Sequence, residues 1–266
     1  MKENRCLEVR NKTVTKANEL IQKSRFNLSL QQQKIVLYLI SQISQYDDDF
    51  EIYEFNIQEF CKVCGIDGNN GKNYQDLKDA IKEIADKSIW ITIGDKETLF
   101  RWIEKPFINR KNGVVQIRLD NDMKPFLLHL RENFTRYELI WTLHFRSKYT
   151  IRLYELIKSI HFHDLDSYEG IYPLDNLKKQ LGAETYKTYQ TFKDRVLKRA
   201  VQEINAYSDK NLSYEAIKTG RAVSKIKFIV SSKGSLEALK IRSDIEKELG
   251  MDQLTLWDRL EEKGLV

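Results

Sequence analysis

Apolar residues recur every three or four positions between Tyr186 and Ala206, a spacing that predicts one buried face of an α-helix. The buried face would consist of Tyr189, Phe192, Val196, Ala200 and Ile204. The opposite face would carry cationic and hydrogen-bonding side chains, namely Lys187, Gln190, Thr191, Arg195 and Lys198. A helix with an apolar back and a cationic front fits the major groove of DNA, but the same pattern is also common on solvated surface helices.

The N-terminal half shows a succession of helix-like and strand-like patterns. Helical periodicity covers 13–24, 30–43, 57–65 and 74–88, and strand-like runs cover 50–55, 89–93, 99–108 and 114–119. The turn at 111–113 would join the last two runs into a hairpin. Because helices followed by a β-hairpin make a winged helix, we expect this fold here, with the hairpin as its wing.

The same order of patterns returns about 115 residues later. Leu37-Tyr38 corresponds to Leu153-Tyr154, and the segment 74–79 corresponds to 189–194. Strand-like runs at 212–220 and 224–231 follow the second copy and are separated by a Gly-Arg turn. A period this long indicates a duplicated domain, because solenoid repeats are about 20–50 residues long. We expect an α+β fold of two tandem winged-helix domains related by a pseudo-twofold axis, with a C-terminal helical extension.

The expected boundaries follow from this repeat. They are an N-terminal winged helix at 1–125, an apolar inter-domain linker at 126–139, a second winged helix at 140–233 and an acidic helical tail at 234–266. The linker would pack between the domains or take part in a dimer–monomer switch. The tail, with Trp257 and Leu260, would hold two amphipathic helices that fold back on the second domain or serve oligomerisation.

Charge is distributed unevenly along the chain. The sequence carries 44 Lys and Arg against 39 Asp and Glu, a net charge of +5. From Thr185 to Lys233 the count is 11 basic to 4 acidic residues, whereas 234–266 holds 5 basic and 8 acidic residues. The basic excess therefore surrounds the predicted helix at 186–206, as on a surface that binds phosphates.

The composition also indicates a compartment. No apolar run approaches the roughly 20 residues that span a bilayer, and the N-terminus lacks a signal-peptide core. Three cysteines without disulfide-like spacing agree with a reducing environment. These features predict a cytoplasmic protein without a membrane partner.

One segment carries a specific family resemblance. The run from Arg146 to Leu156, RSKYTIRLYEL, closely resembles the SKY-x-x-RLYEL signature of the iteron-binding replication initiators of theta-replicating plasmids. The resemblance extends from about Thr13 to Ser231 and includes the segments SLQQQKIVLYLI and FKDRVLKRAVQEIN. It implies a tandem winged-helix initiator.

The resemblance also implies partners. Such initiators bind direct repeats in double-stranded DNA at the plasmid origin as monomers, help to melt adjacent A+T-rich DNA, and recruit the host initiator and replicative helicase. As homodimers they often bind inverted repeats at their own promoter and repress it, which contributes to copy control. The second winged helix usually makes the main base contacts, and the first carries most of the dimer interface.

The candidate base-reading residues have suitable chemistry. Arg195 and Lys198 can donate to guanine, Gln190 suits adenine, and Thr191 can meet a thymine methyl group or a phosphate. Phosphate or secondary contacts are expected from Ser29, Lys72, Asn73, Gln75, Lys78, Lys82, Ser147, Lys148, Lys193, Arg199, Arg221 and Lys225. Acidic residues at 76, 79 and 83 dilute the first-domain set, so we expect that domain to bind DNA more weakly.

Two motifs suggest other chemistry. Cys61 and Cys64 form a C-x-x-C without a second pair, which favours two structural thiols over a zinc or redox site. His161 and His163 resemble the metal-binding pair of nicking initiators, with Tyr186 or Tyr189 as the nucleophile, but they continue a helix and not a central strand. No Walker-type glycine-rich loop is present. We therefore expect a DNA-binding protein, not an enzyme, with no cofactor or metal; a nicking initiator and a plain transcription repressor remain the alternatives.

Overall fold

Two similar sets of elements follow one another in the computed structural model, which describes residues 12–44, 46–63, 71–109, 111–160 and 167–248. The first set is α2 (Asn18–Lys23), α3 (Leu30–Ile40), β3 (Tyr53–Asn56), α4 (Ile57–Val63), α5 (Gly71–Asp86), β4 (Ser88–Ile93) and β5 (Lys96–Arg101). The second set is α7 (Ile140–Leu143), α8 (Lys148–Lys158), β9 (Ser167–Pro173), α9 (Leu174–Leu181), α10 (Tyr189–Phe192), η2 (Lys193–Leu197), α11 (Lys198–Tyr207), β10 (Lys210–Thr219) and β11 (Ala222–Ser232). The order is the same in both, which confirms the predicted tandem winged helices.

The second domain ends in a three-stranded antiparallel sheet in the order β10-β11-β9. The predicted hairpin is present, and Gly220 occupies its turn with a φ of +64°. A residue with a side chain would adopt this backbone conformation only under strain. Strand β9 was not predicted. Ile226, Phe228 and Val230 of β11 are buried, so one face of the sheet belongs to the core of this domain.

The prediction for the first wing is wrong. The hairpin that directly follows α5, as β10–β11 follows α11, is β4–β5, paired from Ser88↔Arg101 to Ile93↔Lys96. The turn before Gly113 joins only the two-residue strand β6 (Phe107–Ile108) to β7 (Val114–Ile117), and β7 pairs mainly with β3. Pairing with a strand about 60 residues earlier, which a local pattern does not reveal, decides where this segment belongs.

The predicted helix at 13–24 is also partly wrong. Residues Thr13–Ala17 form strand β1, and helix α2 begins only at Asn18. The β-branched residues Thr13, Val14 and Thr15 suit a strand, and β1 pairs with β8 (Phe134–Glu138) along its whole length. The expected linker at 126–139 therefore holds ordered elements, since it contains β8 and the second half of α6 (Lys124–Leu127).

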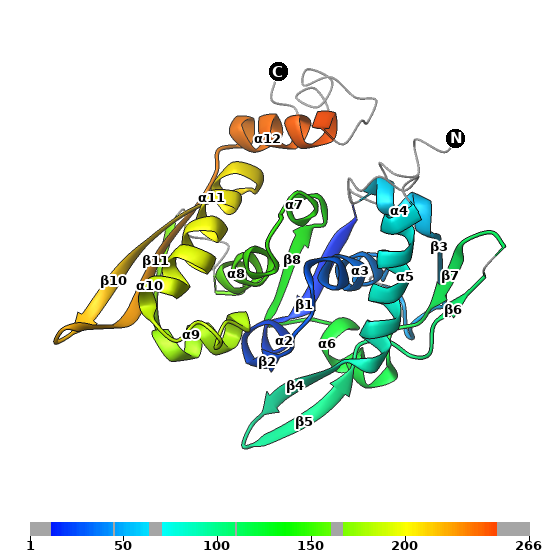
Figure 1. Ribbon diagram of the computed structural model, residues 1–266, viewed down its shortest axis with the longest axis horizontal. Coiled ribbons are helices and arrows are strands. Elements are labelled where there is room, and N and C mark those ends of the chain that lie inside the picture. The colour runs from blue at the N-terminus through cyan, green and yellow to red at the C-terminus, as the bar shows by residue number, and fades with distance from the viewer. Residues whose placement is uncertain (1–11, 45, 64–70, 110, 161–166, 249–266) are drawn as a thin grey trace.

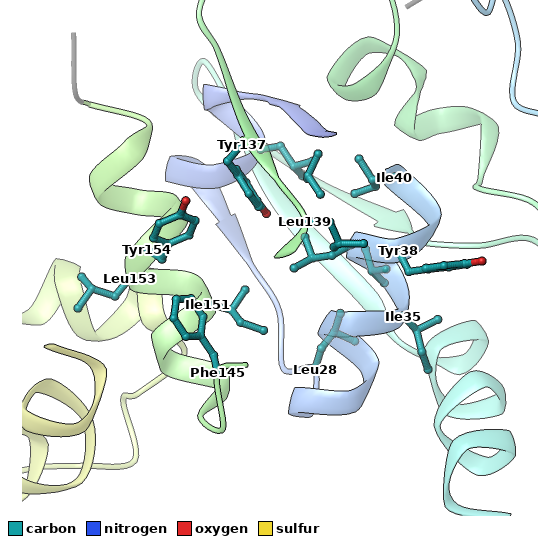
Figure 2. Packing of buried hydrophobic residues seen from close by; sticks show 14 of the residues in the cluster. Leu28, Ile35, Tyr38, Ile40, Tyr137, Leu139, Phe145, Ile151, Leu153 and Tyr154 are labelled. Atoms are coloured by element: carbon teal, nitrogen blue, oxygen red, sulfur yellow. The ribbon is translucent and has the colours of Figure 1, made fainter. Parts of the chain in front are cut away.

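A hydrophobic core continues across the junction of the two domains. Figure 1 shows α3 and α8 in the middle of the molecule, with α5 and the α10–α11 helix on either side. In Figure 2, Ile40 of α3, Leu139 just after β8 and Ile151 of α8 belong to one packed cluster of buried side chains. The apolar linker residues Phe126, Leu127 and Leu128 are buried as well, so they are packed against this core.

The RSKYTIRLYEL run forms a polar part of this junction. Arg152 of α8 donates through Nη2 to the carbonyl oxygens of Ser24 (3.1 Å) and Gln180 (2.6 Å), and its guanidinium lies 4.1 Å from the centre of the Phe26 ring. Glu155 accepts from Lys16 of β1 at 2.6 Å. The run that carries the family resemblance thus connects the two winged helices.

The tail begins with α12 (Ser235–Glu248). Arg242 of this helix forms an ion pair with Glu138 of β8, and the inward-facing Leu239 and Ile245 are buried. At the end of α12, Glu248 also lies 2.9 Å from His144, which directly follows α7. The described part of the tail therefore contacts the second domain, as expected of a tail that folds back, and it contacts β8 as well. Trp257 and Leu260 lie outside the described residues.

Candidate nucleic-acid interface

The helix predicted at 186–206 runs from Tyr189 to Tyr207. Thr188 is its N-cap, and the Thr188 hydroxyl accepts from the backbone N–H of Thr191 at 3.1 Å. The predicted buried residues Phe192, Val196, Ala200 and Ile204 are all inaccessible to solvent, whereas Tyr189 is half-buried. The sequence periodicity therefore located the back of this helix correctly.

A π-helical turn, Lys193–Leu197, interrupts the helix at its centre. The N–H of Lys198 donates to the carbonyl of Lys193, five residues earlier, in place of the usual four. The wider turn places both Val196 and Leu197 in the core. It also changes the helical phase, so the exposed side chains after Arg195 are rotated relative to those before it.

All five candidate base-reading residues are exposed on or just before this helix. Lys187 precedes the cap, Gln190 and Thr191 lie in the first turn, Arg195 lies in the π turn, and Lys198 lies one turn later. Within the described part of the chain, the Arg195 side chain makes no hydrogen bond or ion pair, so its guanidinium is available to a ligand. Its planar fork of N–H donors suits guanine or a phosphate.

Gln190 and Lys198 share a partner that the sequence analysis missed. Nε2 of Gln190 donates to Oδ2 of Asp194 at 2.6 Å, and Nζ of Lys198 lies 2.7 Å from Oδ1 of the same carboxylate. Hydrogen bonds from Lys198 and Gln190 lower the pKa of Asp194, and the hydrogen bond to Asp194 raises the pKa of Lys198. Gln190, Asp194 and Lys198 follow one another at intervals of four residues, and this spacing was the sequence signal that could have predicted their contacts.

The flanking candidates, Lys193 and Arg199, differ in their exposure and in the bonds that they already make. Lys193 is half-buried. Arg199 pairs with Glu203 at 2.8 Å and donates to the carbonyl of Arg146 at 3.1 Å, so it holds the loop before α8. Any phosphate contact by Arg199 would compete with these bonds.

The two candidate phosphate clamps occupy matching places. Ser147 caps α8, where its hydroxyl accepts from the N–H of Tyr149, and the side chain is buried. Ser29 caps α3 through a capping box with Gln32 and is exposed. Nζ of Lys148 donates to Asn27 at 2.9 Å, and burial, with a smaller effect from Lys87, lowers the pKa of Lys148.

Helix α5, the counterpart of the 189–207 helix, presents a more acidic front. Lys72, Gln75 and Lys82 are exposed and Lys78 is half-buried; the side chain of Asn73 lies outside the described residues. Gln75 donates to Asp79 at 2.9 Å, and one turn later Glu83 forms an ion pair with Lys87. This face holds a mixture of charges, whereas the 189–207 face is mainly basic.

The wing of the second domain adds further cations. Lys218, Arg221 and Lys225 are all exposed near the end of the β10–β11 hairpin. In Figure 1 this hairpin lies beside the α10–α11 helix and extends beyond it. The wing and the front of the helix thus both expose cationic side chains. The first wing carries Lys96 and Arg101, also exposed, on β5.

Most residues of the two competing motifs lie outside the described part of the chain. The described residues contain no group of three or more His, Cys, Asp or Glu side chains that could hold a metal ion. Cys61 is buried and free, whereas Cys64, His161 and His163 lie outside the described residues. None of the helices within the described ranges is long and apolar enough to cross a membrane.

Comparisons with known proteins agree with this architecture. Residues 13–158 match the family model for the first winged helix of initiator replication proteins, and residues 173–230 match that for the second winged helix of initiator Rep proteins. A replication initiation protein of Escherichia coli is 24% identical over 251 residues, which cover 91% of this chain and 75% of that protein. The crystal structure of the Pi initiator protein in complex with iteron DNA matches 85% of this chain and 99% of its own with a TM-score of 0.71 and 19% identity. Since the first family model alone spans more than half of its residues, the chain belongs to the family of initiator replication proteins that carry two winged helices.

Proposed function

We propose that this initiator binds double-stranded DNA in a sequence-specific manner through the front of helix 189–207, and that its target is a set of direct repeats at a plasmid origin. The observation that carries the proposal is the exposed Arg195 at the centre of this front, whose side chain has no partner among the residues that the structure describes. The helix is held rigidly from behind by Phe192, Val196 and Ile204, which are fully buried. A rigid helix with free donors suits direct readout in the major groove.

The likeness to the Pi initiator supports this choice of ligand. That protein was crystallised with iteron DNA, and the likeness covers most of this chain, including both winged helices. The two domains would then contact successive major grooves on one face of the DNA. Repeats of about 20 base pairs, or two helical turns, would match this arrangement.

The charge distribution supports a division of labour between the domains. The second domain would make the principal base contacts, because its helix front and its wing are mainly basic. Helix α5 would add weaker contacts, since Asp79 and Glu83 lie among its cations. The three wing cations at 218, 221 and 225 would neutralise phosphates and make the affinity strongly dependent on salt.

The remaining steps of initiation are assigned by family likeness. In this proposal the monomer binds the repeats, a homodimer represses the gene's own promoter, and host proteins supply the helicase. The chain itself would catalyse no reaction. Deleting the gene should abolish plasmid maintenance, whereas a plain repressor would leave replication intact.

The test is a binding selection. The purified full-length chain is incubated with a library of randomised duplexes, and the retained DNA is sequenced. We expect a single consensus that recurs in tandem beside the gene and that is protected from nuclease digestion by the chain. Recovery of unrelated sequences, or of a consensus absent from the plasmid, would refute the proposal.

Nicking is the competing function and can be tested directly. Supercoiled origin DNA is incubated with the chain and Mg²⁺ or Mn²⁺. The proposal expects no site-specific nick. A nick that disappears when His161 and His163 are changed to Ala would establish a nicking initiator instead.

A further inference from the structure

An acidic side chain, Asp194, stands in the middle of the basic front of helix 189–207. It is exposed, and both of its carboxylate oxygens are engaged, Oδ2 by Gln190 at 2.6 Å and Oδ1 by Lys198 at 2.7 Å. Arg195 is its immediate neighbour and remains unpaired within the described part of the chain. A carboxylate on a surface that meets phosphates is repelled by them, so its presence there requires a compensating role.

The bond to Asp194 restricts the amide of Gln190. An unrestrained glutamine side chain has three rotatable bonds and samples many rotamers, which must be ordered when it binds a base. Donation of one Nε2–H to Asp194 leaves the second Nε2–H and Oε1 free. These are the donor and acceptor that a bidentate contact with adenine requires. The carboxylate therefore orients Gln190 without using up its capacity to read a base.

The same carboxylate restrains Lys198. Lysine is a flexible point charge that pairs readily with any phosphate. When Nζ is held by Asp194, one of its three N–H groups is used and its charge is largely offset. Lys198 then contributes less to the affinity for DNA of arbitrary sequence. Two of its N–H groups remain free to donate to the edge of a guanine.

The first domain provides an internal comparison. Gln75 and Asp79 of α5 repeat the Gln190–Asp194 pair, with the same spacing and a similar bond of 2.9 Å. The position that corresponds to Lys198 is Glu83, which pairs with Lys87 at 3.1 Å. The three-residue Gln–Asp–Lys arrangement is therefore present on the helix with the basic front and absent from α5.

We propose that Asp194 is a positioning residue for sequence recognition: it orients Gln190 and Lys198 for base contacts and reduces affinity for DNA that lacks the cognate sequence. This inference rests on the proposed function. A positioning residue differs from a simple contact residue in one measurable respect. Removing the carboxylate should weaken binding to cognate DNA and strengthen binding to other DNA, so the two affinities change in opposite directions.

The experiment measures dissociation constants of the full-length chain for two duplexes. One is the consensus that the unaltered chain selects from a randomised library, and the other is a scrambled duplex of the same base composition. For Asp194→Ala we expect affinity for the consensus to fall at least about fivefold, which is the lower end of one bidentate base contact. Affinity for the scrambled duplex should rise, and its salt dependence should steepen by about 0.9 as Lys198 becomes free to meet a phosphate.

Three further variants separate positioning from charge. Asp194→Asn removes the charge but keeps one carbonyl acceptor, so it should retain more consensus binding than Asp194→Ala. In a Gln190→Ala/Lys198→Ala background, Asp194→Ala should change the consensus-to-scrambled ratio less than twofold. Asp175→Ala, an exposed carboxylate on α9, removes the same charge elsewhere in the domain and should leave that ratio unchanged.

The outcomes are distinguishable. If Asp194→Ala shifts both affinities by the same factor in the same direction, Asp194 acts only through its charge or through folding, and the positioning role is refuted. If it lowers the ratio equally in the double-alanine background, Asp194 acts by itself, and the role is again refuted. If the unaltered chain binds both duplexes equally, the proposed function fails, and this inference fails with it.

Discussion

Lys16 Nζ and Glu155 Oε1 lie 2.6 Å apart at the junction of the two winged helices, and both side chains are almost fully buried. Lys16 belongs to β1 of the first domain, whereas Glu155 belongs to α8 of the second. The hydroxyl of Tyr137 donates to the same oxygen at 2.6 Å. Burial lowers the pKa of Lys16, and pairing with Glu155 opposes that shift. The pair thus connects residues that are 139 positions apart in the sequence.

Breaking this pair should destabilise the whole protein. Lys16→Met would leave the Glu155 carboxylate buried without its ion pair, with Tyr137 as its remaining side-chain hydrogen-bond donor among the described residues, at a cost of about 3–5 kcal/mol. The measurement is the free energy of unfolding in denaturant. Lys16→Met/Glu155→Gln, which removes both charges and keeps an acceptor for Tyr137, should recover most of the loss. A single variant that costs less than about 1 kcal/mol would show that the domains do not depend on this contact.

The parts of this fold that could be predicted were those marked by a short-range pattern of residues in the sequence. The 3–4 spacing that ends in Ile204 predicted the helix, because burial of one face requires that spacing. The RSKYTIRLYEL run identified the family, but its role emerged only in three dimensions, where Arg152 and Glu155 bind residues of the first domain. Partners more than 100 residues away leave no local pattern.

The failures have related causes. The segment 13–17 looked helical because Ala17 continues the apolar spacing of α2, but pairing with β8 made it a strand. The π turn was not predicted because it depends on Val196 and Leu197 both entering the core. Asp194 was not singled out from the sequence, because only cationic and neutral hydrogen-bonding residues were selected as candidates for DNA contact. Its spacing of four residues from both Gln190 and Lys198 was the signal that could have revealed these bonds.

Arg195 should determine base preference at one position of the target. Arg195→Ala removes a guanidinium that has no partner within the described ranges, and it should cost about 1–3 kcal/mol of binding to the selected consensus, with less effect on scrambled DNA. A second selection with this variant should show relaxed preference at a single base pair. Arg199→Ala is the matched control, because that arginine is already engaged by Glu203 and by the carbonyl of Arg146. Equal losses of Arg195→Ala on both duplexes would make Arg195 a phosphate contact.

Arg221, at the turn of the second wing, should contribute to affinity and not to specificity. It is exposed next to Gly220, and Arg221→Ala should reduce the slope of log affinity against log salt by about 0.9 on consensus and scrambled DNA alike. Lys227→Ala provides the control, since Lys227 lies on the same hairpin but pairs with Glu169 at 2.8 Å. For Lys227→Ala, the slope of log affinity against log salt should equal that of the unaltered chain. A loss confined to consensus DNA would show that Arg221 reads sequence.

Asp209 should give the second domain a characteristic sensitivity to acid. Its carboxylate accepts from the Tyr154 hydroxyl at 2.7 Å and pairs with Lys158 at 2.8 Å. Burial alone would raise the pKa of Asp209, but its interactions with Lys158, together with smaller effects of Lys210 and Tyr154, outweigh burial and lower the pKa below the usual 3.8. Because the folded pKa is depressed, the stabilisation is complete above the unfolded value of about 3.9 and is lost as pH falls through the folded value.

This sign can be checked with one substitution. Asp209→Asn removes the charge and should cost about 1.5–3 kcal/mol at neutral pH, as for a hydrogen bond to a charged group. The difference in unfolding free energy between the two proteins should shrink as pH falls below about 3.8, since the unaltered carboxyl is then protonated. Denaturant titrations between pH 2 and pH 7 measure it. A difference that stays constant over this range would mean that the Asp209 carboxylate gains nothing from Lys158, and that the hydrogen bond from Tyr154 alone stabilises the end of α8.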